Sequence, residues 1–256
     1  MSKIIFAFDI DGTAIFSKNR IKSDFKDKIC VEHINGIEFS FMSKKESAAY
    51  IELCTQFKDR VMLLPITSRS VSQYKQINWP SGISPQFAIT TNGANLLENG
   101  VSSLEWHSSF LNTIEKTKEK RNNIAAIFSG CEGFKKKRNC DDTYDVFLFD
   151  TRENAFAAAE QLNWKDNSVN VTVSGRKVYA IPAGILKETA LLKLKKTINP
   201  CFIIAAGDSP LDIGFLSMAD YQIVTSPLLL DRFNPQRAKF SRSIFSTAVN
   251  NPRLKS

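Results

Sequence analysis

The chain has 256 residues, 43% hydrophobic and 23% charged, a composition typical of a globular protein that excludes a disordered or collagenous chain. The formal net charge is +8, and no apolar run approaches the ~20 residues of a membrane span, so we expect no membrane partner. Five scattered cysteines, with no CxxC pair among them, predict reduced thiols in a cytoplasmic protein.

Five short apolar segments predict the buried parallel strands of an α/β protein. They are residues 3–8, 61–66, 86–90, 202–206 and 220–224. Near-continuous apolar runs of this kind are typical of strands covered by helices on both faces. Helical patterns separate several of them: 43–57, which opens with capping-box spacing, and 187–196. We therefore expect a Rossmann-like open parallel sheet.

Residues 105–181 interrupt this alternation and predict an inserted α+β module. Its expected elements are a charged stretch (113–123), a Gly- and Lys-rich loop (129–140), a strand (144–149), a helix (151–163) and a hairpin (169–182). The predicted domains are thus a core, residues 1–104 and 182–256, and an insertion between them. Asn99-Gly100 predicts a further hairpin, and the weakly patterned residues 231–256 predict a C-terminal tail.

Two aspartates follow the first predicted strand, in the sequence Asp9-Ile10-Asp11-Gly12-Thr13. Side chains alternate along a strand, so the two carboxylates project towards one side. Carboxylates this close repel each other unless a cation lies between them or one is protonated, and Mg²⁺ is the natural partner for such oxygen ligands. The spacing does not fit an EF-hand loop, and a structural Asp-Gly turn is the alternative to a catalytic site.

A second pair of acids, Asp208 and Asp212, follows the fourth predicted strand. If a helix begins at Pro210, the two acids are about one helical turn apart. Alone, this pattern is equally typical of a helix cap and an acid in the first turn. Together with Asp9 and Asp11, it brings four carboxylates to two strand ends and predicts a divalent-cation site.

Hydroxyl and basic side chains supply further candidates. Thr67, Ser68 and Arg69 follow the second predicted strand, where hydroxyls and backbone N–H groups can hold phosphate oxygens. A Ser/Thr helix cap is the commoner explanation of that pattern. Lys187 opens a helical pattern; a lone surface lysine is usually only solvated, but beside a carboxylate cluster it could neutralise bound phosphate.

In chain order, these motifs resemble those of the haloacid dehalogenase-like (HAD) phosphohydrolases. The resemblance rests on Asp9 to Thr13, Thr67, Lys187, and Gly207-Asp208 with Asp212, and spans most of the chain. Asn92-Gly93 resembles the step that precedes the cap in the subgroup with a C2-type cap, which includes Cof-like sugar phosphatases and sucrose- and trehalose-phosphate phosphatases. This resemblance implies that residues 105–181 form such a cap.

The resemblance also implies a role for each acid. Asp9 would attack phosphorus and form an aspartyl-phosphate, and Asp11 would protonate the leaving oxygen and then activate water. Asp9, the Asp11 carbonyl and Asp208 would hold Mg²⁺, and Asp212 would support the ion directly or through water. Many relatives have Asn-Asp where this chain has Leu211-Asp212, so one polar contact around the metal is missing.

The remaining motifs would contact the substrate. Thr67 and Lys187 would bind phosphoryl oxygens, with Ser68, Arg69 and Asn92 as further substrate contacts. We therefore expect a Mg²⁺-dependent phosphatase that acts on a small phosphorylated metabolite, in particular a sugar phosphate. The alternatives are a nucleic-acid-end phosphatase, a phosphosugar mutase and, without catalysis, a sugar-phosphate-binding module.

The excess positive charge is local. Residues 113–140 hold eight Lys/Arg against three Glu, and residues 231–256 hold six against one Asp. The dense run Lys135 to Arg138 is most simply a solvated loop, or else a cap loop that attracts an anionic substrate. A nucleic-acid partner would favour interleaved aromatic residues, and only Phe134 is adjacent.

Overall fold

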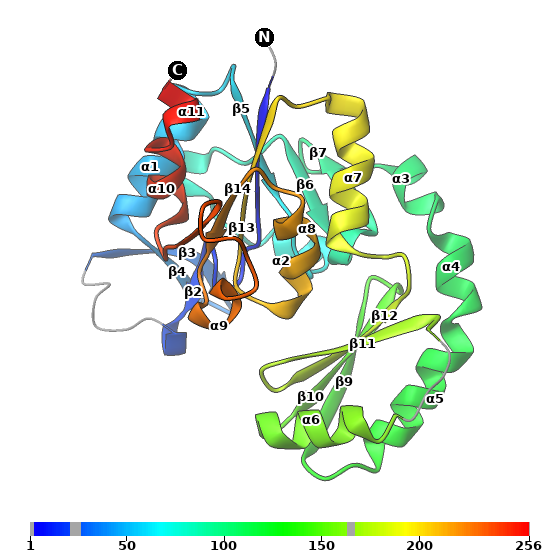
Figure 1. Ribbon diagram of the computed structural model, residues 1–256. Coiled ribbons are helices and arrows are strands. Elements are labelled where there is room, and N and C mark those ends of the chain that lie inside the picture. Colours follow the sequence, from blue (N-terminus) through cyan, green and yellow to red (C-terminus); the bar gives the residue numbers. More distant parts are fainter. Residues whose placement is uncertain (1–2, 21–26, 163–166, 256) are drawn as a thin grey trace. The chain divides into compact units, whose positions relative to one another are not determined.

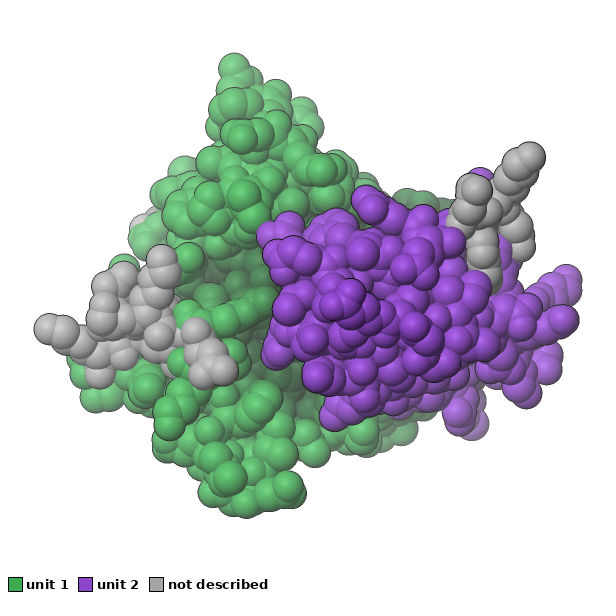
Figure 2. All heavy atoms as spheres, turned by 90° about the horizontal axis from the view of Figure 1, so that it is seen from below, with its two compact units in different colours: residues 1–102, 187–256 green, residues 103–186 purple. Residues whose placement is uncertain are grey.

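The computed structural model describes residues 3–20, 27–162 and 167–255 and divides the chain into two compact units (Figure 2). Unit 1 comprises residues 1–102 and 187–256, and unit 2 comprises residues 103–186. Unit 2 is therefore an insertion in the sequence of unit 1. Within the described ranges, no helix combines the length and apolarity that crossing a membrane requires.

A five-stranded parallel sheet with the order β15-β14-β13-β1-β5 forms the centre of unit 1 (Figure 1). Its strands are β1 (Ile4–Phe8), β5 (Val61–Pro65), β13 (Phe202–Gly207), β14 (Tyr221–Val224) and β15 (Ala238–Phe240). Every residue of β1 and β5 is buried, as their unbroken apolar runs require. The predicted open parallel α/β sheet is confirmed.

Helices lie on both faces of this sheet, α1 and α10 on one and α7 and α8 on the other (Figure 1). The helices of unit 1 are α1 (Lys44–Thr55), α2 (Val71–Tyr74), α7 (Lys187–Ile198), α8 (Ile213–Ser217), α9 (Pro227–Leu230), α10 (Ile244–Val249) and α11 (Pro252–Lys255). Ser43 caps α1 by accepting a hydrogen bond from the Glu46 backbone N–H at 3.1 Å. The predicted helices at 43–57 and 187–196 are thus present.

One predicted strand departs from the parallel sheet. β6 (Phe87–Thr90) meets β5 only through a parallel bridge between Ile66 and Ile89. Its regular ladder is antiparallel, with β7 (Asn95–Glu98) and then β8 (Val101–Ser102), which confirms the hairpin at Asn99-Gly100. Backbone N–H groups point alternately to the two neighbouring strands: that of Ile66 donates to Phe8 of β1, and that of Thr67 donates to Ile89 of β6. The N atom of residue 65 would face β6 as well, but this residue is proline and has no N–H to donate.

A second antiparallel sheet of unit 1 has no counterpart among the predicted elements. Its order is β2 (Phe16–Ser17), β4 (Ile37–Ser43) and β3 (Lys28–Ile34). β3 contains Lys, Glu and His between apolar residues, and two register shifts disturb its ladder with β4. The period-2 pattern that marks a strand is therefore broken in the sequence.

Unit 2 packs helices against a four-stranded antiparallel sheet with the order β11-β12-β10-β9. Its elements are α3 (Leu104–Ser108), α4 (Leu111–Lys116), α5 (Lys118–Ser129), β9 (Phe134–Cys140), β10 (Tyr144–Phe149), α6 (Arg152–Glu160), β11 (Val169–Ser174) and β12 (Lys177–Pro182). The hairpin at 169–182 and the strand at 144–149 are confirmed. The end of the predicted helix, residue 163, lies outside the described residues.

The predicted loop at 129–140 is wrong, because Phe134–Cys140 forms the edge strand β9. The basic run Lys135 to Arg138 therefore belongs to a strand, and all four of its residues are exposed. An edge strand tolerates such charge because only one side of its backbone is paired, and lysines there discourage pairing with another chain. Exposure on both faces also removes the apolar alternation by which a strand is recognised.

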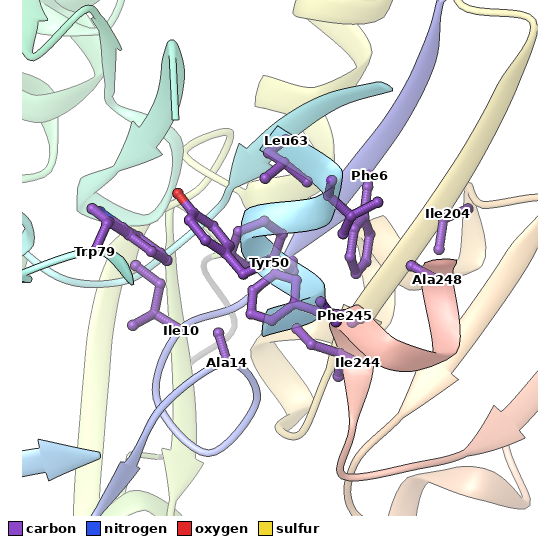
Figure 3. Packing of buried hydrophobic residues seen from close by; sticks show 14 of the residues in the cluster. Phe6, Ile10, Ala14, Tyr50, Leu63, Trp79, Ile204, Ile244, Phe245 and Ala248 are labelled. Atoms are coloured by element: carbon purple, nitrogen blue, oxygen red, sulfur yellow. The ribbon is translucent and has the colours of Figure 1, made fainter. Parts of the chain in front are cut away.

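The predicted C-terminal tail is also wrong. Within 231–255, the chain forms β15, α10 and α11, and Ile244 and Phe245 are fully buried. The Phe245 ring lies 5.2 Å from those of Phe8 and Tyr50, and Figure 3 shows it among the residues of the core cluster. Glu46 of α1 accepts the backbone N–H groups of Phe245 and Ser246 at 2.7 and 3.0 Å. Ile244 and Phe245 are an isolated apolar pair between polar residues, so the sequence shows no helical or strand periodicity here, although both side chains are part of the core.

Replacement of Phe245 by Ala should lower the free energy of unfolding by about 3–5 kcal/mol, since it removes a fully buried ring from an aromatic cluster. Urea unfolding followed by fluorescence measures this change. Phe240→Ala is the control: Phe240 is 42% exposed, and its loss should cost about 1 kcal/mol or less. Equal losses in the two variants would show that residues 244–249 do not belong to the cooperative core.

Candidate active site

The site lies at the carboxyl edge of the parallel sheet in unit 1. The register pairs Phe8 with Pro65 and with Ala206, so β1, β5 and β13 end at the same level. Asp9, Thr67 and Asp208 follow these ends directly or within two residues. The carboxyl edge of an open parallel sheet is where ligands bind in such folds.

Lys187, the first residue of α7, joins two of the predicted acids. Its Nζ donates to Asp9 Oδ1 at 2.5 Å and to Asp212 Oδ1 at 2.6 Å. All three side chains are buried, and each therefore needs the others, because an unpaired charge in this place would be strongly destabilising. The structure thus places Lys187 in the carboxylate cluster rather than on the surface.

Asp212 also fixes the loop that carries Asp208. Its Oδ2 accepts hydrogen bonds from the backbone N–H groups of Asp208 and Ser209, at 3.1 and 2.9 Å, and from Ser209 Oγ at 2.8 Å. Ser209, and not Asp208, is the N-cap of the 3₁₀ turn Pro210–Asp212. Oxygen atoms of Asp9, Asp208 and Asp212 all lie within 4.8 Å of one another.

The concentration of negative charge perturbs these acids. Burial raises the pKa of Asp9 well above its ordinary value; Lys187 opposes the rise, and Asp212, Asp208 and Asp11 add to it. Burial, together with the charge of Asp212, raises the pKa of Asp208 to about 7, although Arg20 and Lys187 counteract the shift. Arg20 donates to Asp208 Oδ2 at 3.1 Å. The cluster therefore holds more negative charge than its lysine and arginine neutralise.

These residues fit a hard divalent cation. The donor set consists of carboxylate oxygens from three aspartates, the ligand type that Mg²⁺ prefers, with no sulfur or imidazole in the same group. Burial is the largest cause of the raised pKa values of Asp9 and Asp208, and repulsion between the carboxylates adds to it; a cation between the carboxylates would remove that repulsion.

The Asp11 side chain lies outside that group of three. It is 54% exposed, and its two oxygens accept hydrogen bonds from Arg69 Nε and Nη2 at 2.8 Å each. Gly12, which follows it, has φ +87°, and a Cβ at this residue would approach Asp208 Oδ2 to 2.4 Å. Only glycine allows this close passage of the two loops.

Two predicted substrate contacts, Thr67 and Asn92, are buried next to each other. The Asn92 backbone N–H donates to the Thr67 carbonyl at 3.0 Å, and Thr67 Oγ1 accepts the Arg69 N–H at 3.1 Å. Ser68 is half-buried, and the Arg69 guanidinium binds Asp11 and Glu32. Roles in substrate binding for these residues stay predictions.

Sequence reasoning missed several residues that shape the site. Thr225, directly after β14, donates from Oγ1 to the Gly12 carbonyl at 3.0 Å and so ties the loop after β1 to its neighbour. Its position after a predicted strand, like that of Thr67, was a usable signal. Arg20 and Glu32 lay in segments without any recognised element, and nothing in their local pattern marks them.

The fold recurs in solved structures of low sequence identity. A sucrose-phosphatase from Synechocystis, solved with sucrose and phosphate, matches with a TM-score of 0.68 over 100% of this chain and 99% of its own, at 15% identity. A haloacid dehalogenase-like hydrolase from Bacillus subtilis matches with a TM-score of 0.60 over 98% of both chains, at 14% identity. The corresponding values for trehalose-6-phosphate phosphatase from Aspergillus fumigatus are 0.54, 98% and 94%, at 12% identity.

No protein-family model and no curated protein matches the sequence. At the identities of the structural matches, the likeness establishes the fold. The chain has the fold of the haloacid dehalogenase-like hydrolases, as the order of its motifs predicted.

The raised pKa of Asp208 predicts a pH-dependent stability for the protein in EDTA. The folded state holds this proton up to about pH 7, whereas the unfolded chain releases it near pH 4, so stability falls as pH rises across this window. Asp208→Asn cannot ionise, so its stability relative to the unsubstituted protein should grow by about 1–3 kcal/mol between pH 5 and pH 8. Urea unfolding at both pH values measures the difference, and parallel curves for the two proteins would contradict it.

Proposed function

We propose that this chain is a Mg²⁺-dependent phosphomonoester hydrolase that acts on a small phosphorylated metabolite through an aspartyl-phosphate intermediate. The observation that carries the proposal is the buried contact of Lys187 with Asp9 and Asp212, beside Asp208. At one edge of a HAD-like sheet, this arrangement combines a candidate nucleophile (Asp9), an ammonium group (Lys187) and carboxylate oxygens that can bind a metal ion.

In the first half of the reaction, an Asp9 carboxylate oxygen attacks phosphorus. The new bond joins Asp9 to phosphorus as the bond from phosphorus to the leaving oxygen breaks, and Asp11 gives that oxygen its proton. Attack requires ionised Asp9, a form that burial disfavours and the Lys187 ammonium favours. Lys187 and the Thr67 hydroxyl are the groups we assign to the phosphoryl oxygens.

In the second half, water hydrolyses the aspartyl-phosphate. Asp11, now ionised, takes a proton from the attacking water, and the bond between phosphorus and Asp9 breaks, which regenerates both carboxyl groups and releases phosphate. The half-exposed position of Asp11, in contrast to buried Asp9, suits a group that must exchange protons with leaving groups and water.

We assign four groups to the metal ion: the side chains of Asp9, Asp208 and Asp212 and the Asp11 carbonyl. When bound, a divalent ion lowers the repulsion between these carboxylates and a phosphate dianion. Among the described residues, three cationic side chains contact five acidic ones in and next to this site. The cations are Arg20, Arg69 and Lys187, and the acids are Asp9, Asp11, Glu32, Asp208 and Asp212. Two further positive charges therefore suit the site.

Two observations favour a sugar phosphate as substrate. Two of the structural matches are, by their descriptions, a sucrose-phosphatase and a trehalose-6-phosphate phosphatase. Unit 2, residues 103–186, lies in the sequence where a C2-type cap belongs, and we assign it that role. The exposed basic strand residues Lys135 to Arg138 would then attract an anionic substrate at low ionic strength.

Phosphate release from a panel of phosphorylated sugars, other small metabolites and 5′- or 3′-phosphorylated oligonucleotides, with Mg²⁺ or with EDTA, tests this function. We expect turnover of at least one sugar phosphate with Mg²⁺ and none in EDTA. Preference for oligonucleotide ends would support the nucleic-acid alternative, and transfer of phosphate within a sugar would support a mutase. Binding of sugar phosphates without turnover would leave the binding module, and full turnover in EDTA would overturn the metal assignment.

Substitution of the two loop aspartates separates their roles. Asp9→Asn removes the nucleophile and should abolish turnover of every substrate. Asp11→Asn removes the proton donor, which is typically worth about 10²–10⁴-fold, so its loss should be smaller for an acidic leaving group than for a sugar alcohol. Values of kcat/KM on 4-nitrophenyl phosphate and on the best sugar phosphate give the comparison, because they report the step that expels the leaving group; equal losses for both variants on both substrates would contradict the separate roles.

A further inference from the structure

Arg69 links Asp11 to a second, buried carboxylate. While Nε and Nη2 donate to Asp11, Nη1 and Nη2 also donate to the Oε1 and Oε2 atoms of Glu32, at 2.8 and 3.0 Å. One planar guanidinium thus holds two carboxylates at once, with a fork geometry that a lysine cannot reproduce. The linkage runs from Glu32 in β3 to Asp11 in the loop after β1.

The exposed fraction of the side chain rises along this chain of contacts, most of all at Asp11. The Glu32 side chain is 3% exposed, that of Arg69 is 7% exposed and that of Asp11 is 54% exposed. Burial alone lowers the pKa of Arg69, but Asp11 and Glu32 raise it above its ordinary value, so the guanidinium stays charged. Glu32 therefore anchors Arg69 from the protein interior, and Asp11 is the end that solvent and substrate can reach.

The fold contains two devices that place Glu32. Ser40 Oγ of β4 donates to Glu32 Oε2 at 2.6 Å and so gives the carboxylate a second partner besides Arg69. The β3–β4 register shifts on both sides of Glu32, and as a result the consecutive residues Val31 and Glu32 are both buried, where a regular strand would bury only one. Irregularities of this kind redirect a side chain and are common next to active sites.

We propose that Glu32 is a positioning residue for Asp11, acting through Arg69. The inference rests on the proposed function, in which Asp11 transfers protons to and from the reacting oxygens. Without the Glu32 carboxylate, the buried guanidinium keeps one of its two anionic partners and the longer contact of Nη1 with the Gln73 carbonyl, at 3.3 Å, and it loses the two hydrogen bonds that fix the side opposite Asp11. An error of about 1 Å in the position of a reacting group can cost about 10²-fold in rate.

The experiment compares Glu32→Gln with the unsubstituted protein on two aryl phosphates of similar shape, 4-nitrophenyl phosphate and phenyl phosphate. Phenol resembles the tyrosine side chain, with a pKa of about 10, and needs a proton from Asp11 far more than the acidic nitrophenol does. We expect kcat/KM, which reports the step that expels the leaving group and not the later hydrolysis common to both substrates, to fall at least about tenfold more on phenyl phosphate than on 4-nitrophenyl phosphate. A general loss of stability would lower both rates by the same factor.

Glu46→Gln is the matched control. Glu46 is also a buried glutamate of unit 1, but it binds the backbone of α10, so its substitution should lower the melting temperature without any dependence on the leaving group. If Glu32→Gln does not fold, Ser40→Ala loosens Glu32 without removing its charge and should give a smaller effect of the same kind.

A double substitution isolates the path through Asp11. In an Asp11→Asn background, Glu32→Gln should no longer change the ratio of the two rates, because the group that it orients is already lost. A preserved ratio in the single variant, or an unchanged effect in the Asp11→Asn background, would overturn the role of Glu32 while leaving the phosphatase intact. Absence of turnover by the unsubstituted protein on the whole substrate panel would instead overturn the proposed function.

Discussion

The contact on which the rest of the site depends is that of the Lys187 ammonium with Asp9 and Asp212. These acids come from loops that follow different strands, and both are buried with their lysine. Two buried carboxylates would repel each other, so the cation is what allows Asp9, directly after β1, and Asp212, in the 3₁₀ turn after β13, to lie close together. β1 and β13 lie side by side in register, which brings the loops after them together at one edge of the sheet.

A second ionic network, which shares no side chain with the first, orients Asp11. Asp9 is held by an ammonium from α7, whereas Asp11 is held by the Arg69 guanidinium and, behind it, Glu32. The two aspartates are only two residues apart, but their surroundings differ in burial and in the geometry of the cation. A point charge suits a carboxylate that must be free to attack, and a fork suits one whose orientation has to be kept. The structure thereby gives two chemically identical side chains different environments.

The backbone around the aspartates is as constrained as the side chains. Gly12 takes a positive φ where the loop after β1 passes Asp208, and Thr225 donates to the carbonyl of that same glycine. Asp212 in turn binds the backbone N–H groups of Asp208 and Ser209. The loop after β1 is thus held by a side chain from a distant segment, Thr225, whereas the loop after β13 is held by Asp212 from its own 3₁₀ turn.

The sequence by itself determined the parallel core and its acids. Near-continuous apolar runs marked β1, β5, β13 and β14 because strands buried on both faces have almost no polar side. Asp9, Asp208 and Lys187 stood out by their places next to those runs and helices. Strand β9, with charge on both faces, and the short helix α10 carry no such period, so neither could be found in this way.

Only the tertiary structure decided which charges meet. Glu32 and Arg69 are far apart in the chain, and Glu32 is turned inward by an irregular register that no local pattern encodes. Arg69 had the sequence context of a phosphate ligand, yet two carboxylates surround its guanidinium. Residue types and strand ends are local properties that a sequence displays, whereas the partner of a buried charge depends on the packing of distant segments.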